Sequence, residues 1–338
     1  MWKKIVDYYK IPEAAKEPST DSARFKKIRL ISFLTATLGY GMYYVCRLSM
    51  NVIRKPMVDD GVFTETEIGI IGSCLFFTYA IGKFCNGFIA DRSNVKKLMS
   101  TGLLISALIN LALGFTNSFI VFAVLWGING YFQSMGAASG VVSLSRWFDA
   151  SNRGTYYGYW SASHNLGEAI TFISIAILAT NFGWRYGLIG AGLIGIAYFF
   201  IMQWLMKDTP QKYGYLLEDA TSKKEEKNKA DFNASQKTVL CSPAIWILAL
   251  ASAFMYISRY AVNSWGVFYL ETMKGYSTLD ASFIISISSV CGIVGTVASG
   301  LISDKLFKGS RNIPALVFGL MNVLALCLFL FNTLLILM

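Results

Sequence analysis

Long apolar runs separated by short polar segments set the pattern of this 338-residue chain. About 20 apolar residues are enough to cross a bilayer as a helix. The runs are too continuous for the strands of a membrane barrel, the other structure that satisfies backbone hydrogen bonds in lipid. The pattern therefore predicts an all-α polytopic membrane protein. The nine expected spans are residues 30–53, 66–90, 98–117, 119–143, 155–180, 185–206, 244–270, 279–303 and 313–337.

Prolines fall at the ends of these predicted helices. Pro56 and Pro210 follow helix ends, whereas Pro243 and Pro314 lie in first turns, where the missing N–H costs nothing. We therefore expect no proline inside a span, and we expect the first span to end before Pro56.

The composition agrees with a membrane protein. The chain is 54% hydrophobic and 15% charged, against about 25% charged residues in a soluble domain. The six cysteines follow no metal or redox spacing, and the first 29 residues are polar and basic rather than a cleavable signal peptide. We expect neither a metal nor a cofactor.

Basic residues orient the predicted helices. Twenty-three of the 30 Lys and Arg residues fall in the N-terminal tail and in alternate loops, and four fall in the opposite loops. The positive-inside rule then places the N-terminus in the cytoplasm. The net charge of +10 is explained by this topology and requires no nucleic-acid partner.

One long polar segment divides the chain. Residues 207–240 are rich in Lys, Glu and Asn, which is typical of a connector rather than a span. We expect a six-helix bundle at 1–206, this segment as a cytoplasmic linker, and three helices of a second bundle at 241–338.

An internal repeat relates the two parts. The pattern R-x-x-x-N begins at Arg47 and again, 212 residues later, at Arg259. A second pattern, G-x-x-x-D followed by a base, begins at Gly87 and recurs 213 residues later at Gly300. Two patterns with nearly one offset indicate that the last three helices repeat the first three, as in transporters built from two parallel halves.

The acid and base of the second pattern predict a gate. Asp91 and Arg92 close one predicted helix, and Asp304 and Lys305 close its counterpart. Such charges can dock against neighbouring helix ends and separate when the halves rock. The alternative is a loop that only directs membrane topology.

Three basic residues remain inside the predicted spans: Arg47, Lys83 and Arg259. Each costs about 2.5–3.5 kcal/mol at a helix centre, so packing alone does not explain them. Snorkelling to an interface is the alternative for a single residue. The scarcity of acids in the spans favours a diffusible anion, and a guanidinium binds phosphate or carboxylate with two hydrogen bonds. Two arginines with a lysine favour phosphate.

Tyrosines lie one or two turns before each of these cations. They can donate hydrogen bonds to a ligand, pack, or belong to an interfacial belt. The four tyrosines are Tyr40, Tyr44, Tyr79 and Tyr256.

His164, the single histidine, lies near the middle of a predicted span. A titratable group at that depth is a functional candidate, and imidazole titrates near neutral pH. Glu168 follows one turn later on the same face, so we expect it to pair with His164 or relay a proton.

Several stretches resemble the organophosphate:phosphate antiporters of the major facilitator superfamily, which include bacterial hexose-phosphate and glycerol-3-phosphate transporters. The stretches run over the whole chain. They are residues 39–47, 79–84, 91–94, 130–136, 160–165, 208–211, 256–260 and 303–311.

The resemblance implies a twelve-helix major facilitator fold and exchange of a phosphorylated sugar or glycerol for inorganic phosphate in a bacterial inner membrane. It assigns substrate binding to Arg47, Arg259, Lys83, His164 and the four tyrosines. Ser161 stands where the family often has Asn and is counted with them. Glu168 stands where the family often has Gly, and a common Lys after the first Arg is replaced by Leu48.

Against that pattern the chain ends after the ninth helix. We expect it to insert without exchanging phosphate by itself, either as a fragment or with a separate polypeptide that supplies helices 10–12. Within the family, a membrane sensor of hexose phosphate is the alternative function. A membrane enzyme is disfavoured, because the sequence shows no metal cluster, nucleophile–base pair or phosphate-binding glycine loop.

Overall fold

The computed structural model describes residues 7–15, 21–215, 241–306 and 312–331. The chain divides into two compact units, Met1–Glu225 and Glu226–Met338, here called unit 1 and unit 2. This division falls inside the segment 207–240 that the sequence predicts as a linker. Each unit is described by itself.

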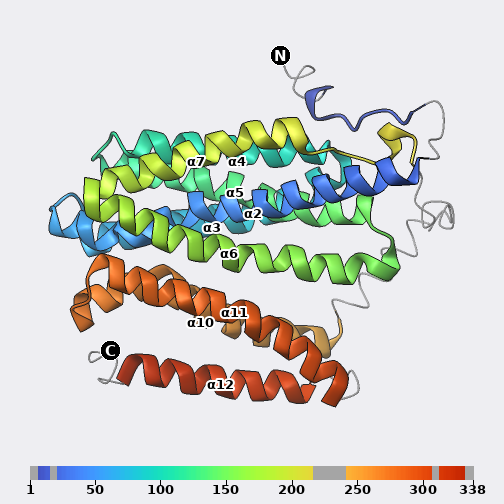
Figure 1. Cartoon of the computed structure of the whole chain (residues 1–338). Coiled ribbons are helices and arrows are strands. Elements are labelled where there is room, and N and C mark those ends of the chain that lie inside the picture. The colour runs from blue at the N-terminus through green and yellow to red at the C-terminus, as the bar shows by residue number, and fades with distance from the viewer. Residues whose placement is uncertain (1–6, 16–20, 216–240, 307–311, 332–338) are drawn as a thin grey trace. The chain divides into compact units, whose positions relative to one another are not determined.

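Unit 1 is a bundle of six long helices that lie alongside one another (Figure 1). The tightest pairings are α3 with α5, α4 with α7, and α2 with α6. A short 3-10 turn, η1, follows the last helix at Gln211–Tyr213. The six helices are α2 (Ser22–Asp59), α3 (Glu65–Arg92), α4 (Val95–Leu113), α5 (Phe119–Trp147), α6 (Ala150–Phe182) and α7 (Trp184–Leu205).

Unit 2 contains α10 (Pro243–Lys274), α11 (Thr278–Leu306) and α12 (Asn312–Phe331). α11 packs against both of the others. The side-chain amide of Asn322 on α12 donates to the hydroxyl of Ser258 on α10 at 3.0 Å, a polar link between two apolar helices.

Each of the nine predicted spans corresponds to one long helix in the described residues, and the all-α fold class is confirmed. Seven of these helices are long and apolar enough to cross a membrane. The other two are α2, which carries polar and basic residues along its length, and α12, whose described apolar stretch is Leu316–Phe329.

The prediction for the end of the first helix was wrong. α2 runs on to Asp59 with Pro56 inside it, so Arg54 and Lys55 belong to the helix rather than to a loop. A proline near a helix end removes one backbone hydrogen bond, and the last turn is held here by an ion pair between Lys55 and Asp59 at 2.6 Å. The N–H of Asp60 also donates to the Pro56 carbonyl at 3.0 Å.

Large apolar side chains cover the outer faces of the unit 1 helices. Phe77 on α3 is 74% exposed and Trp204 on α7 is 79% exposed. Exposed apolar surface on this scale suits lipid rather than water. Together with the membrane-length helices it makes the chain an integral membrane protein.

Glycines bring α3 and α5 into close contact. A Cβ atom on Gly130 would overlap the Leu75 carbonyl oxygen and the Thr78 hydroxyl, and a Cβ on Gly82 would lie 2.9 Å from the Tyr131 carbonyl oxygen. The Thr78 hydroxyl donates to the Gly127 carbonyl at 2.5 Å. Small residues with interhelical hydrogen bonds are the usual means of association in lipid.

One end of unit 1 is closed by an ion pair between a buried carboxylate and a half-buried guanidinium. Arg146 at the end of α5 lies 3.2 Å from a carboxylate oxygen of Asp208, just beyond α7. The same oxygen accepts from the Val95 N–H at 2.6 Å, at the start of α4. Arg146 also donates to the carbonyls of Asp91 at 3.2 Å and Ser93 at 3.0 Å. Four helix ends therefore meet at one guanidinium and one carboxylate.

Burial raises the pKa of the Asp208 carboxyl, and Arg146 and the backbone N–H of Val95 only partly offset this effect. Desolvation of a buried pair commonly exceeds its Coulombic gain, so the pair specifies how the helix ends dock more than it adds net stability.

The N-terminal segment covers the same end. The carbonyl of Tyr9 accepts from the Asn94 N–H at 2.7 Å, and the Ala15 N–H donates to the Gln211 carbonyl at 2.9 Å. Residues 7–15 thus connect the α3–α4 turn to the segment after α7.

Gly130→Ala is expected to destabilise unit 1 by about 1–3 kcal/mol, because the added methyl must push α3 away from α5. Thermal unfolding in detergent measures the effect. Gly158→Ala on α6 is the control, since nothing lies within 4 Å of a Cβ at that position. Equal melting temperatures for both variants would contradict the close-contact account.

Asp208→Asn is expected to cost about 3 kcal/mol, because it leaves the half-buried Arg146 without its countercharge. Adding Arg146→Met should recover most of this loss, since no unpaired charge then remains. The free energy of unfolding of both single variants and the double variant measures the coupling. Additive losses in the double variant would rule out the pairing. As a comparison, Lys55→Gln breaks the solvent-accessible pair with Asp59 and should cost less than about 1 kcal/mol.

Candidate functional site

Arg47 is the centre of the candidate site in unit 1. It lies on α2, and only 5% of it is exposed. Its guanidinium carbon lies 4.2 Å from the ring centroid of Tyr79, 5.7 Å from that of Phe76 and 5.9 Å from that of Tyr44. Aromatic rings hold a guanidinium in one orientation by cation–π attraction without using its N–H donors.

Tyr79 also brings the second cation into the cluster. The ammonium of Lys83 lies 5.3 Å from the centroid of the same ring that Arg47 contacts. Tyr79 is buried, whereas Lys83, one turn further along α3, is exposed. Both predicted cations of unit 1 therefore share one tyrosine.

A second group of rings joins α2 to α6. The rings of Tyr44 and His164 lie 5.8 Å apart, and those of Tyr40 and Tyr44 lie 5.5 Å apart edge to face. Tyr40 also stacks on Trp160 at 4.5 Å. Because Tyr44 contacts both Arg47 and His164, the rings form a continuous line from α3 through α2 to α6.

Glu168 and Ser161 share α6 with His164. The helix is unbroken from Ala150 to Phe182, so Glu168 follows His164 by one turn on the same face. Glu168 is buried and Ser161 is half-buried. The pairing of Glu168 with His164 stays a prediction.

Unit 2 supplies the other predicted arginine. Arg259 lies on α10 and is half-buried, and the neighbouring Tyr256 is exposed with its ring stacked on that of Tyr260 at 5.8 Å. The position of Arg259 after a tyrosine on the first helix of its unit matches that of Arg47 on α2.

The predicted gate residues lie at helix ends. Asp91 and Arg92 are the last residues of α3, and both side chains are exposed. The backbone carbonyl of Asp91, rather than its carboxylate, accepts a hydrogen bond from Arg146. Asp304 and Lys305 end α11, and their side chains lie outside the described residues. The gate stays a prediction.

Sequence reasoning missed Arg54, which is only 2% exposed. It had been assigned to a loop because Pro56 was interpreted as a stop. The usable signal was its spacing of seven residues from Arg47, which places both on one face of a helix. Trp160 was also missed, although it lies four residues before His164.

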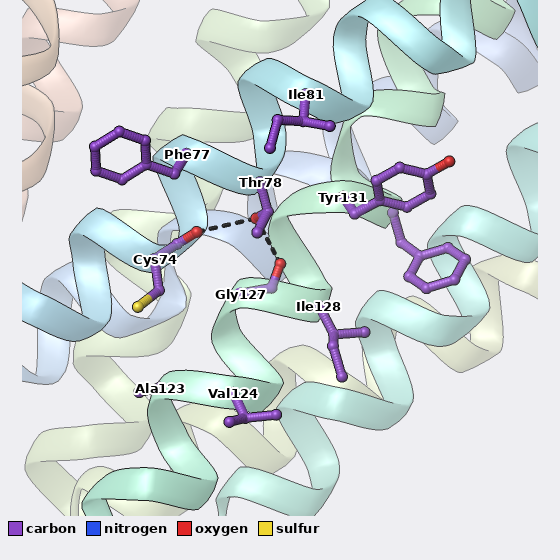
Figure 2. Close-up of a pocket in the computed structure, with 10 residues that line it drawn as sticks. Cys74, Phe77, Thr78, Ile81, Ala123, Val124, Gly127, Ile128 and Tyr131 are labelled. Carbon is purple, nitrogen blue, oxygen red and sulfur yellow. Dashed lines mark hydrogen bonds between the residues drawn. The ribbon is translucent and has the colours of Figure 1, made fainter.

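An open groove between α3 and α5, of about 610 Å³, is a different kind of feature (Figure 2). It contains no charged side chain, so it does not suit an anion. Two lining residues, Thr78 and Tyr131, carry hydroxyl groups, and the Thr78 hydroxyl donates to the Gly127 backbone carbonyl. The lining residues are Cys74, Phe77, Thr78, Ile81, Ala123, Val124, Gly127, Ile128, Tyr131 and Phe132.

The cluster around Arg47 therefore has the chemistry of an anion site. It combines a buried guanidinium, an ammonium, tyrosine hydroxyls and an imidazole in a membrane-spanning bundle. Each of these groups can donate a hydrogen bond to a phosphoryl or carboxylate oxygen.

Comparison with known proteins agrees with this chemistry. Residues 30–338 match the model of the Major Facilitator Superfamily. A probable hexose phosphate transport protein of Chlamydia muridarum is 33% identical over 337 residues, which cover 95% of this chain and 74% of that protein. The membrane sensor protein UhpC of Salmonella typhimurium is 32% identical over 305 residues, covering 88% and 69%. The glycerol-3-phosphate transporter of Bacillus subtilis is 31% identical over 315 residues, covering 88% and 70%.

Solved structures share the fold. A bacterial homologue of the human lysosomal transporter Spinster, in an inward-facing conformation, matches with a TM-score of 0.69 at 18% identity and covers 83% of this chain. The chain spans 63% of the length of that structure. A D-xylose–proton symporter matches with a TM-score of 0.55 at 15% identity, covering 83% of this chain and 69% of that one.

The family match covers most of the chain, and the relatives are hexose-phosphate and glycerol-3-phosphate transporters with a related sensor. The chain belongs to the major facilitator superfamily, within its organophosphate:phosphate antiporter family.

Proposed function

We propose that this protein exchanges a phosphorylated sugar or glycerol phosphate for inorganic phosphate by alternating access. The observation that carries the proposal is the convergence of Arg47, Lys83, Tyr79, Tyr44 and His164 within unit 1. A buried guanidinium such as that of Arg47 is costly in a membrane unless an anion uses it. The transport functions of the named relatives support the same substrate class.

Each residue has a distinct role in this proposal. Arg47 binds the phosphoryl group with two parallel hydrogen bonds, and Lys83 adds a second positive charge. The hydroxyls of Tyr40, Tyr44 and Tyr79 donate to the remaining oxygens. His164 gains a proton as the anion approaches, because an adjacent negative charge stabilises the imidazolium.

Arg259 enters the proposal through the internal repeat. It occupies the position in unit 2 that Arg47 occupies in unit 1, and both follow a tyrosine by three residues. We assign it to the same anion, with Tyr256 beside it. Asp91 and Arg92, with Asp304 and Lys305, act as the gate on the basic side, and that side, with the N-terminus, faces the cytoplasm of a bacterium.

A sensor of hexose phosphate is the second candidate, because the relatives include the membrane sensor protein UhpC. Binding without exchange would favour the sensor. Proteoliposomes loaded with inorganic phosphate and offered labelled hexose phosphate or glycerol 3-phosphate separate the two. Uptake of the intact ester that requires internal phosphate supports antiport, and release of phosphate from the ester would indicate an enzyme.

Arg47→Lys is expected to weaken phosphate binding tenfold or more, because lysine keeps the charge but loses the bidentate fork. Arg259→Lys should have a similar effect. Equilibrium binding of labelled phosphate to the detergent-solubilised protein measures both. Arg185→Lys is the control, since Arg185 lies on α7 against Trp184 and outside the cluster. Wild-type affinity in both site variants would refute the assignment.

His164→Gln is expected to flatten the dependence of phosphate binding on pH between about 6 and 8, where an imidazole titrates. Phosphate itself titrates in this range, so the informative quantity is the difference between the variant and the wild type. The same binding assay at a series of pH values measures it. Superimposable profiles would show that His164 does not take up the proton.

A further inference from the structure

We propose that the start of α4 and the end of α7 form a binding site for the headgroup of an anionic phospholipid. Lys96 and Lys207 bind its phosphate, and the outer face of α7 receives an acyl chain beside Trp204. The site lies apart from the cluster around Arg47, so this inference does not rest on the proposed function.

The first observation is that two lysines meet at one helix end. α4 and α7 lie side by side in unit 1 (Figure 1). The ammonium of Lys96, in the first turn of α4, donates to the carbonyl of Gln203 in the last turn of α7. The ammonium of Lys207 donates to the carbonyl of Trp204 at 3.3 Å. Because these carbonyls belong to consecutive residues, the two ammonium groups lie close together.

Capping of α7 accounts for only part of what these two lysines offer. The last carbonyls of a helix have no partner within it, and lysines near the C-terminus commonly supply one. An ammonium group has three N–H donors, and in the described part of the chain each of these lysines donates one hydrogen bond to the protein. Both side chains are half-buried rather than enclosed, so the remaining donors are available to a ligand at the surface.

The second observation is an excess of positive charge at this point. Lys97, Lys207 and Lys212 all lie within electrostatic range of Lys96. Among the described residues, the carboxylate that attracts Lys96 is that of Asp208, which is already engaged in the ion pair at this end of unit 1. Cations in the first turn of a helix are also unfavourable, because the helix dipole is positive there. An anion between the lysines relieves both repulsions.

The third observation is the apolar surface beside the lysines. Phe200 and Trp204 are 65% and 79% exposed, and their spacing of four residues places both rings on one face of α7. Lys207 turns back onto the Trp204 carbonyl, so its ammonium lies at the basic end of this face. Tryptophan and lysine are typical of the boundary between lipid tails and headgroups. A free phosphate makes no use of an apolar face, so we assign the site to a lipid.

The choice of neighbouring lipid tests the proposal. The full chain is placed in phosphatidylcholine nanodiscs that contain increasing fractions of phosphatidylglycerol with brominated acyl chains, which quench nearby tryptophans. The difference between the wild type and Trp204→Phe isolates the quenching of Trp204, and brominated phosphatidylcholine measures ordinary contact with lipid. A basic residue near the surface strengthens attraction to an anionic lipid about fivefold. The wild type is therefore expected to favour phosphatidylglycerol about twentyfold.

Substitutions locate the preference at the two lysines. Lys96→Gln and Lys207→Gln should each lower it about fivefold, and together they should bring it close to one. Arginine at both positions keeps the charges and should keep most of the preference. The control is Lys26→Gln with Lys27→Gln, which removes two exposed charges from the first turns of α2 at the same end of unit 1. It should change the preference less than about twofold.

Each outcome decides for or against the site. Equal quenching by the two lipids in the wild type would overturn the proposal without any variant. Equal losses in the two double glutamine variants would also overturn it, because they would show a general attraction between the basic end and an anionic surface. Inorganic phosphate added to the nanodiscs distinguishes the sources of the anion. Displacement of phosphatidylglycerol by phosphate would assign the lysines to a free anion, whereas unchanged quenching supports the lipid.

Discussion

Burial of two guanidinium groups on one membrane-spanning helix is the constraint on which the rest of unit 1 depends. Arg47 and Arg54 are almost fully buried, and a charged side chain costs about 2.5–3.5 kcal/mol at the centre of a span. These guanidinium groups are tolerated only if the face of α2 that carries them packs against polar atoms and aromatic rings rather than lipid. The packing of α2 is arranged so that this condition holds.

The contact of α2 with α6 shows how that is achieved. A Cβ atom on Gly167 of α6 would lie 2.8 Å from the Cα of Gly41 on α2, so the two backbones meet at a pair of glycines. This close contact anchors α2 on α6, while Arg47 on another face of α2 contacts Phe76 and Tyr79 of α3. Gly130 of α5 likewise allows close contact with the backbone of α3. Small residues thus set the positions of the helices, and long cationic side chains fill the space that remains.

Much of this could be predicted from sequence, because membrane spans and intramembrane charges are signals carried by single segments. The nine helices and the cations Arg47 and Lys83 needed only local pattern. Two things needed tertiary information. Arg146 and Asp208 are separated by 62 residues and pair only because α5 and α7 end at the same level. Arg54 was assigned to a loop because a proline near a helix end can either stop the helix or remain within its last turn, and neighbouring residues decide which.

The same physics explains why α2 is not among the seven helices that qualify as spans by hydropathy. α2 carries Arg47, Asn51 and Arg54 together with tyrosines, and these polar residues lower its average hydropathy although it packs within the six-helix bundle. α7, which contributes no residue to the cluster around Arg47, is among the seven qualifying helices. In a transport protein of this kind, the span that composition ranks lowest is therefore a reasonable first place to look for the substrate, and here it carries both buried arginines of unit 1 named above.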